Sequence, residues 1–171
     1  NYLFNRARRD YLDDSTYKSS PFTDRIESRY IGNTHFIEGY GQWKIKGFDL
    51  LTGGDVRINQ TEQWYWSTGP FGPYAPAPLN ASMKQFSPYV SLLTKKGKWN
   101  WEIGGRVNLH SEYGSNFSFT FNPAYRINSE LRSFVNVYTA FKTPTLYQLF
   151  DAFAGNPDLL PEQSLVAEGG V

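Results

Sequence analysis

The chain has 171 residues, about the length of one ordinary domain, and a formal net charge of +1, which gives no reason to expect a polyanionic partner. It contains no cysteine, so a disulfide framework and a thiolate metal site are both excluded. No apolar run approaches the roughly 18 residues that a membrane-spanning helix needs.

The first 24 residues divide into a strand-like and a loop-like part. Residues 2–9 predict the upper part of a strand, with a basic cluster at its end. Residues 10–24 are polar and are expected to form a loop. Asp10, Asp13 and Asp14 either form a solvated acidic loop or supply oxygen ligands to calcium, although they lack the spacing of a helix-loop-helix calcium site.

From Ile37 the sequence alternates with a period of two, which is typical of strands with two different faces. A tight turn is expected at Lys46-Gly47, after which residues 48–64 continue the alternation. That second strand is longer than the roughly 9–11 residues that cross a bilayer, so it should project beyond the membrane.

A long loop is expected over residues 66–82, where Gly-Pro pairs and further prolines interrupt the pattern. Aromatic residues gather before and within it. Those at 64–66 either anchor the strand at a membrane interface or form an apolar wall for a bulky ligand. Phe71 and Tyr74 suit ligand contact or loop packing better.

Four more alternating stretches follow, and the connections alternate between short and long. Short turns lie near Lys46, Lys96 and Ser129, and longer connections cover residues 66–82, 112–116 and 141–164. This pattern predicts an all-β fold, an antiparallel up-and-down transmembrane β-barrel, here a partial barrel of about seven or eight strands. An aromatic content of 18% and a mean hydropathy of −0.52 fit one lipid face, one wet face and polar loops.

Two details qualify the strand predictions. Pro88 and Pro123 fall inside strands, where proline normally marks an edge or a bulge. On the apolar face, an aromatic girdle is expected near the short turns. On the polar face, charged residues are expected to line a lumen, paired with one another or with a plug, or simply solvated. The girdle would be formed by Trp43, Trp99, Trp101 and Tyr125, and the lumen would be lined by Glu38, Asp55, Arg57, Glu102 and Arg106.

The stretch from Phe141 to Ser164 is predicted to be irregular, neither a strand nor an amphipathic helix, because three prolines and Gly155-Asn156-Pro157 break regular pairing. It is nevertheless rich in apolar residues. A long irregular connection of this kind usually folds on itself and often serves function.

The same stretch resembles the barrel domain of TonB-dependent outer-membrane receptors. The resemblance lies in the order and spacing of Phe141-Lys142-Thr143-Pro144, Leu146, Leu149-Phe150, Gly155-Asn156-Pro157-Asp158-Leu159, Pro161-Glu162, Ser164 and Glu168. It implies that residues 1–171 are part of a barrel in the bacterial outer membrane. We expect this chain to contain neither the plug domain nor a signal peptide and to be an internal piece of a larger protein.

The resemblance also implies a function. Such receptors capture a scarce, bulky nutrient at their outer loops and import it when the inner-membrane protein TonB pulls on the plug. The partners are therefore outer-membrane lipid, the rest of the receptor, TonB through the missing plug, and a small-molecule nutrient. The spacing is most similar to that of cobalamin receptors, with ferric siderophores second; the absence of a histidine between Pro144 and Asn156 argues against haem.

Ligand contacts are expected from the loops, and location and chemistry select Trp66, Phe71, Tyr74, Tyr113, Phe150 and Phe153. No catalytic residues, metal site or cofactor are expected, and no nucleic-acid recognition module is visible. A function from another class stays open: a soluble β-sandwich that binds carbohydrate on the aromatic stretch at residues 64–74.

Overall fold

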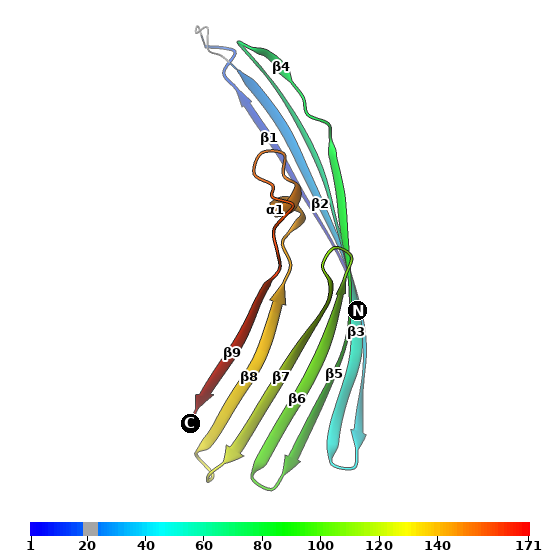
Figure 1. The fold of residues 1–171 in the computed structure, drawn as a ribbon, viewed down its shortest axis with the longest axis vertical. Coiled ribbons are helices and arrows are strands. Elements are labelled where there is room, and N and C mark those ends of the chain that lie inside the picture. The colour runs from blue at the N-terminus through cyan, green and yellow to red at the C-terminus, as the bar shows by residue number, and fades with distance from the viewer. Residues whose placement is uncertain (19–23) are drawn as a thin grey trace.

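A computed structural model describes residues 1–18 and 24–171 as one antiparallel sheet with a single short helix (Figure 1). The strands lie in the sheet in chain order, except that the short β4 pairs only with β3. The elements are β1 (Tyr2–Asp14), β2 (Arg25–Ile45), β3 (Phe48–Gly69), β4 (Gly72–Tyr74), β5 (Leu79–Lys96), β6 (Trp99–His110), β7 (Gly114–Arg126), β8 (Arg132–Lys142), α1 (Leu146–Phe150) and β9 (Glu162–Gly170).

The topology confirms the predicted up-and-down architecture. Eight strands follow the path β1-β2-β3-β5-β6-β7-β8-β9, and β4 brings the sheet to nine strands. The sheet is open, with β1 and β9 as its edges. Because the described residues form one sheet rather than two packed sheets, the alternative of a β-sandwich is wrong.

The register separates an apolar face from a polar face. Residues paired directly across antiparallel strands project from the same face. One row joins Ile37, Val56 and Phe86 and continues to Leu109, and the adjacent row joins Glu38 and Asp55 and continues to Ser87. We call the face of Val56 the outer face and the face of Asp55 the inner face. Large apolar side chains are exposed on the outer face, whereas Asp55 and Ser87 on the inner face are buried.

The two ends of the sheet carry different connections, as predicted. At one end, β2 and β3 are joined by Lys46 and Gly47, whose φ angles of 37° and 91° are both positive, as in a tight two-residue hairpin. We call this the turn end (lower end in Figure 1) and the opposite end the loop end. The expected loop at residues 112–116 is shorter than predicted, because β6 ends at His110 and β7 begins at Gly114.

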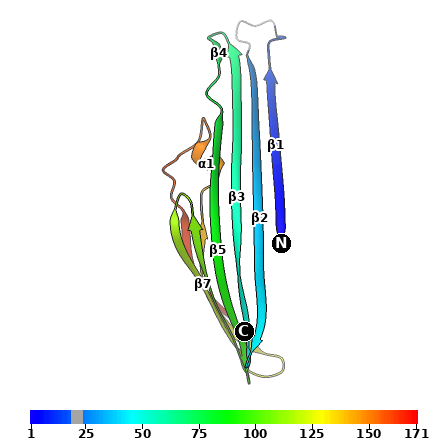
Figure 2. The ribbon, with the colours of Figure 1, turned by 90° about the vertical axis from the view of Figure 1, so that its right-hand side faces the viewer.

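The strands near the N-terminus extend far beyond the others. β2 and β3 have 21 and 22 residues, which corresponds to about 70 Å of extended chain, against the roughly 25 Å height of a lipid-facing apolar band. These strand lengths agree with the prediction that the sheet projects beyond the bilayer. Figure 2 shows β1, β2 and β3 rising together beyond the top of β7.

Two predicted loops are partly strand. The acidic-loop prediction is wrong for Asp10, Asp13 and Asp14, which belong to β1. Asp10 forms ion pairs with Arg8 and Arg29, at 2.6 Å each. Residues 19–23 of that predicted loop lie outside the described residues. Similarly, β3 continues to Gly69 and β5 begins at Leu79, so the predicted loop at 66–82 is shortened from both ends.

The two strand prolines interrupt hydrogen bonding without shifting the register. Beside Pro88, β5–β6 pairing stops after Phe86↔Leu109 and resumes at Tyr89↔Arg106 in the same register. β7–β8 pairing likewise skips Pro123 and its neighbour Asn122. Proline lacks the amide donor that the ladder needs, and here its effect is local, with no bulge.

Candidate ligand-binding site

The connection between β8 and β9 contains a short helix that the sequence did not predict. Thr145 begins α1 with a capping box, in which the Gln148 amide donates to Thr145 Oγ1 (3.2 Å) and the Thr145 amide donates to Gln148 Oε1 (2.9 Å). Each partner satisfies an amide that the first turn of a helix leaves free. This reciprocal pair fixes where the helix starts in an otherwise irregular segment.

A tight turn follows α1. Asp151 Oδ1 accepts the amides of Phe153 (3.1 Å) and Ala154 (2.9 Å), and the Gly155 amide donates to the Asp151 carbonyl (2.9 Å). A Cβ at Gly155 would lie 2.5 Å from that carbonyl oxygen, so the turn requires glycine there. These contacts hold Phe153 in a defined position.

The helix is docked on the inner face of the sheet. Leu146 and Leu149 are buried against Met83 of β5, and Ala81, Tyr113, Phe150 and Leu159 pack around them. The Tyr113 hydroxyl, in the β6–β7 turn, donates to the Leu159 carbonyl (3.1 Å). Figure 2 shows α1 beside β5 on one side of the sheet. We call residues 143–161, which contain α1, the helical loop.

An aromatic cleft of about 480 Å³ lies between the helical loop and the walls of β1, β2 and β3. Two pairs of rings bridge the loop and the sheet: the centroids of Tyr65 and Phe153 lie 4.7 Å apart, and those of Tyr30 and Tyr147 lie 6.1 Å apart. The cleft is lined by Arg9, Tyr11, Ile26, Ser28, Tyr30, Tyr65, Tyr147 and Phe153.

The chemistry of this cleft suits a large organic ligand. Tyrosine rings offer apolar faces for packing together with hydroxyl groups that donate and accept hydrogen bonds. Arg9 adds one guanidinium, which can bind a carboxylate or another anionic group through two parallel hydrogen bonds. A cleft with mostly apolar walls and a few polar groups is the usual form of a small-molecule site.

The six residues selected from the sequence fall in different places. Phe153 lines the aromatic cleft, and the Tyr74 ring lies 6.2 Å from Tyr65 at its border. Tyr113 and Phe150 pack under the helical loop. Phe71 is fully exposed at the hairpin tip beyond β3. Trp66, which is paired with Glu27, has the same parity along β3 as Val56. It therefore projects from the outer face.

Sequence reasoning missed Arg9, Tyr11 and Tyr30 as cleft residues, and it considered Tyr65 only within residues 64–66, for which an interface anchor and a ligand wall both stayed open. The signal was the strand alternation itself, since Tyr65 has the same parity along β3 as Asp55 and projects from the inner face. The predicted loop over residues 10–24 concealed the same alternation in the last part of β1, and residues 25–36 of β2 received no prediction because the alternation is clear only from Ile37. Tyr147 lies in the stretch predicted to be irregular, where no alternation assigns a face to its side chain.

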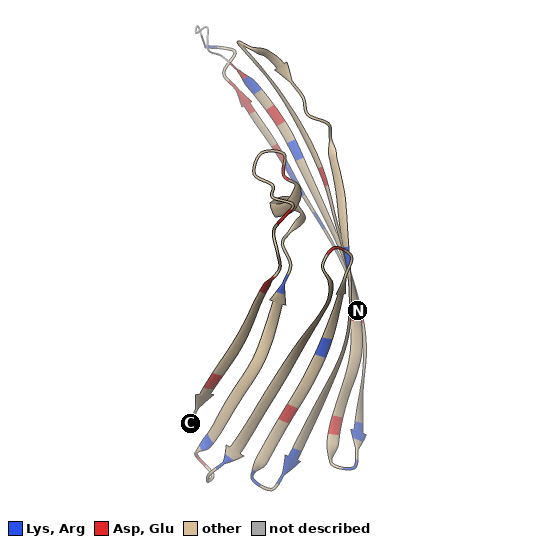
Figure 3. Cartoon of the chain, viewed as in Figure 1, with Lys and Arg blue, Asp and Glu red and all other residues tan. Residues whose placement is uncertain are grey.

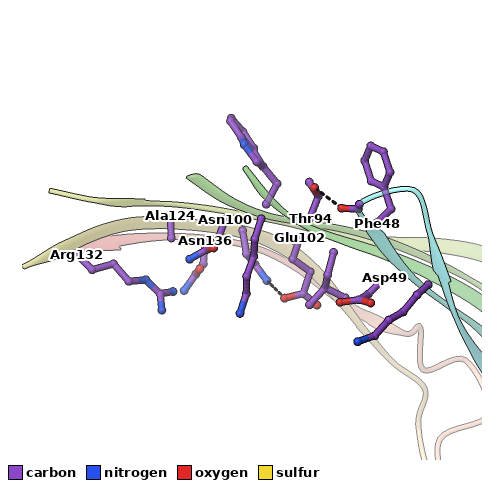
Figure 4. A pocket seen from close by; sticks show the side chains of 14 residues that line it. Phe48, Asp49, Thr94, Asn100, Glu102, Ala124, Arg132 and Asn136 are labelled. Atoms are coloured by element: carbon purple, nitrogen blue, oxygen red, sulfur yellow. Dashed lines mark hydrogen bonds between the residues drawn. The ribbon is translucent and has the colours of Figure 1, made fainter. Parts of the chain in front are cut away.

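A second cleft, of about 590 Å³, opens on the inner face at the turn end (Figure 4). It is polar and charged, and Asn122 Nδ2 donates to Glu102 Oε2 within it (3.3 Å). Its charged lining residues are Lys44, Asp49, Lys95, Glu102 and Arg132. This cleft lies at the other end of the sheet from the aromatic cleft.

The charged residues expected on the inner face are largely engaged with one another and their neighbours. Arg106 forms an ion pair with the buried Asp55, and the Tyr89 hydroxyl donates to Glu38 Oε1 (3.0 Å). Arg57 lies 5.6 Å from the centroid of the Phe36 ring. Of the three alternatives predicted for these charges, pairing with groups of the same sheet therefore describes much of the inner face.

Among the described residues, no group of histidine and acidic side chains is arranged to hold a metal ion. No helix in this part of the chain is long and apolar enough to cross a membrane.

One open antiparallel sheet with an exposed apolar face, a polar face and a loop folded against that polar face defines the wall of an outer-membrane type of β-barrel. The family model described as "TonB dependent receptor-like, beta-barrel" matches residues 1–171, so the chain belongs to the TonB-dependent receptor β-barrel family. This family consists of bacterial outer-membrane receptors rather than enzymes.

The relatives agree with this assignment. The "Vitamin B12 transporter BtuB" of Photobacterium profundum is 36% identical over 76 residues, which is 44% of this chain and 12% of that protein. The siderophore receptor PirA from Pseudomonas aeruginosa matches 98% of this chain and 35% of its own, with a TM-score of 0.64 and 18% identity. The copper transporter OprC matches 96% of this chain and 31% of its own, with a TM-score of 0.64 and 10% identity.

This chain therefore spans about a third or less of the proteins that it matches. At these identities, the similarity to solved structures establishes the fold alone.

Proposed function

We propose that the receptor containing this chain binds a scarce, bulky nutrient at its loop end and imports it across the outer membrane with energy supplied through TonB. The observation that carries this proposal is the aromatic cleft between the helical loop and β1–β3, in a chain whose whole length belongs to the receptor-barrel family. The import step requires a plug and the remaining strands, which are partners within the same receptor.

The cargo that we propose is cobalamin. Support comes from the 36% identity over 76 residues with a vitamin B12 transporter and from the chemistry of the cleft. A corrin is a broad, nearly planar ring with amide groups at its edge. Tyrosine faces suit the ring, and tyrosine hydroxyls suit the amides.

A ferric siderophore is the second candidate, and Arg9 is the observation that favours it. The guanidinium of Arg9 lines the same cleft as four tyrosines. Many iron chelates are anionic and contain aromatic groups, which such a site would attract through charge and stacking.

Calorimetric titration of the complete, detergent-solubilised receptor distinguishes these candidates, with cobalamin, a ferric siderophore and haem as separate titrants. Saturable binding of cobalamin alone supports the proposed cargo. Binding of the siderophore alone keeps the receptor and overturns the cargo. Absence of binding by all three overturns this set of cargoes and directs the search to glycans and peptides.

Two neighbouring substitutions test the cleft itself. We expect Tyr65→Ala to weaken binding about tenfold or more, because it removes an aromatic wall that contacts Phe153. Trp66→Ala removes a comparable ring from the opposite face and should leave affinity unchanged. An effect of Trp66→Ala equal to that of Tyr65→Ala would contradict the cleft assignment and restore Trp66 as a ligand contact.

A further inference from the structure

The turn end of the sheet is strongly basic although the chain as a whole is nearly neutral. Residues 44–49, 95–98 and 126–132 contain seven basic and two acidic residues, a net charge of +5. The rest of the chain therefore carries −4. Figure 3 shows basic residues at each of the turns at this end. The basic residues are Lys44, Lys46, Lys95, Lys96, Lys98, Arg126 and Arg132, and the acidic ones are Asp49 and Glu130.

These basic residues divide between the two faces of the sheet. Lys95 is paired with Asn100, and both line the polar cleft of the inner face; Lys44 and Arg132 line it too. Lys96 is paired with Trp99 and shares the outer face with it. The sequence therefore places similar charges on both sides of the same wall.

On the outer face, aromatic rings form a continuous surface directly beside Lys96. The centroid of the Trp99 ring lies 5.0 Å from that of Trp101 and 4.8 Å from that of Tyr125, and the Trp101 and Phe121 centroids lie 5.9 Å apart. We call these four residues the aromatic platform. Trp99 is 43% exposed, so the platform is open to its surroundings.

Lys98 is held against the same surface. Its Nζ lies 5.9 Å from the centroid of the Tyr125 ring and donates to the Ile127 carbonyl (2.9 Å). An ammonium group has three donors, so two remain for another acceptor. Lys98 thus links the β5–β6 turn to the β7–β8 turn and presents a positive charge at the edge of the platform.

This arrangement matches an amphipathic anionic ligand. In an outer-membrane barrel the outer face meets lipid, and aromatic rings near strand ends lie at the level of the headgroups. The short turns of such barrels face the periplasm, so the turn end lies at the periplasmic leaflet. An acyl chain can pack along Trp101 and Phe121 while a phosphate accepts from Lys96 and Lys98. Basic side chains at a membrane surface favour anionic over zwitterionic headgroups.

We propose that the aromatic platform with Lys96 and Lys98 is a binding site for an anionic phospholipid of the periplasmic leaflet. The ligand class is a phosphodiester lipid with net negative charge, such as a phosphatidylglycerol, and the role is to anchor the turn end of the barrel at a fixed depth. This proposal is independent of the cargo and of the aromatic cleft.

The test uses the complete receptor, delipidated in detergent and titrated with short-chain phosphatidylglycerol or phosphatidylcholine under native mass spectrometry. Wild-type receptor should retain phosphatidylglycerol in preference to phosphatidylcholine. The double variant Lys96→Gln/Lys98→Gln should bind phosphatidylglycerol about 30-fold more weakly, since each basic group near an anionic surface contributes roughly a fivefold factor. Lys96→Arg/Lys98→Arg should keep the preference because it keeps both charges.

A matched control removes the same charge from the other face. Lys44→Gln/Lys95→Gln lies at the same end but on the inner face, and should bind phosphatidylglycerol as the wild type does. Equal losses in the two Gln variants would overturn the site, since net charge alone would then explain binding. Equal retention of both lipids by the wild type would also overturn it. Heat-modifiable migration in gels verifies that each variant is folded.

Discussion

At the scale of single residues, Tyr113 shows how one side chain in a short turn positions a distant loop. Its hydroxyl donates to the Leu159 carbonyl, and its ring lies beside His110 and the buried core under α1. Burial raises the pKa of Tyr113, and the nearby Glu112 raises it further. Both effects favour the protonated phenol, which is the form that can donate.

We therefore expect docking of the helical loop to weaken at alkaline pH. Because the folded pKa is raised, the stabilisation is complete below the ordinary tyrosine pKa of about 10 and is lost as pH rises through the raised pKa of Tyr113. A spin label can be attached through the substitution Asp158→Cys in a receptor otherwise free of cysteine. This label should become more mobile as the pH rises through the raised pKa of Tyr113. Tyr113→Phe should be mobile at lower pH as well and lose this transition; an unchanged transition in Tyr113→Phe would assign it to another group.

The ion pair between Arg106 and Asp55 gives a second prediction at this scale. Asp55 is 2% exposed, so its charge depends on Arg106. We expect Arg106→Leu to lower the free energy of unfolding by about 3 kcal/mol, because it leaves a buried charge unpaired. Arg106→Leu combined with Asp55→Leu should recover much of that loss. Urea unfolding of the complete receptor in lipid vesicles measures both, and additive losses would argue against the pairing.

At the scale of elements, the helical loop is stabilised by its cap and by two buried leucines. Thr145→Ala removes the capping box and should weaken the loop by about 1 kcal/mol. Leu149→Ala should weaken it by about 2–4 kcal/mol, because Leu149 is 3% exposed against Met83.

Hydrogen exchange of the Gly155 and Asn156 amides, which donate to Asp151 and Gln148, reports this loop separately from the strands. Both variants should speed exchange there and leave exchange in β5 and β6 unchanged. Thr145→Ser is the matched control and should retain protection. Equal acceleration throughout the sheet would show that the loop and sheet unfold as one unit.

The elements also show where sequence reasoning succeeds. Alternation, with Leu51 as an exception, predicts the faces of β3, β5 and β6, and the register in the structure confirms them. The prediction failed where polar residues occur on both faces, as in β1 from Asp10, because above the membrane the outer face meets water and no longer needs apolar residues. α1 was missed because five residues between prolines produce no helical periodicity.

The candidate site was harder to predict than the fold for a related reason. The cleft forms from four segments, β1, β2, β3 and the helical loop, and sequence alone does not show that Phe153 meets Tyr65. Location near a loop selected Phe153 together with Trp66, which alternation places on the opposite face. Knowledge of the pairing register, rather than of residue types, was the missing information.

At the scale of the whole molecule, the two faces of the sheet should respond differently to charge. Ile103 is 53% exposed on the outer face, and its chain neighbour Glu102 lies in the inner polar cleft. Ile103→Lys should cost about 2–4 kcal/mol in the bilayer, as expected for a cation near the middle of a lipid-facing band. Glu102→Lys should cost less, because it meets water and polar groups.

Folding of the two variants of the complete receptor into vesicles, followed by urea titration, measures this difference. A larger penalty for Glu102→Lys than for Ile103→Lys would contradict the assignment of the apolar face to lipid.

The order of the strands has a consequence for how the molecule assembles. Every long strand pairs with its neighbours in the chain, so the sheet can grow one hairpin at a time without bringing remote segments together. The exception is the helical loop, in which Leu146 and Leu149 must meet Met83, more than sixty residues earlier. Since that contact needs β3 and β5 already in place, the ligand cleft should be the last feature to form. We therefore expect a kinetic intermediate in which the sheet is complete but the helical loop has not docked. This intermediate would lack the cleft and would bind no cargo.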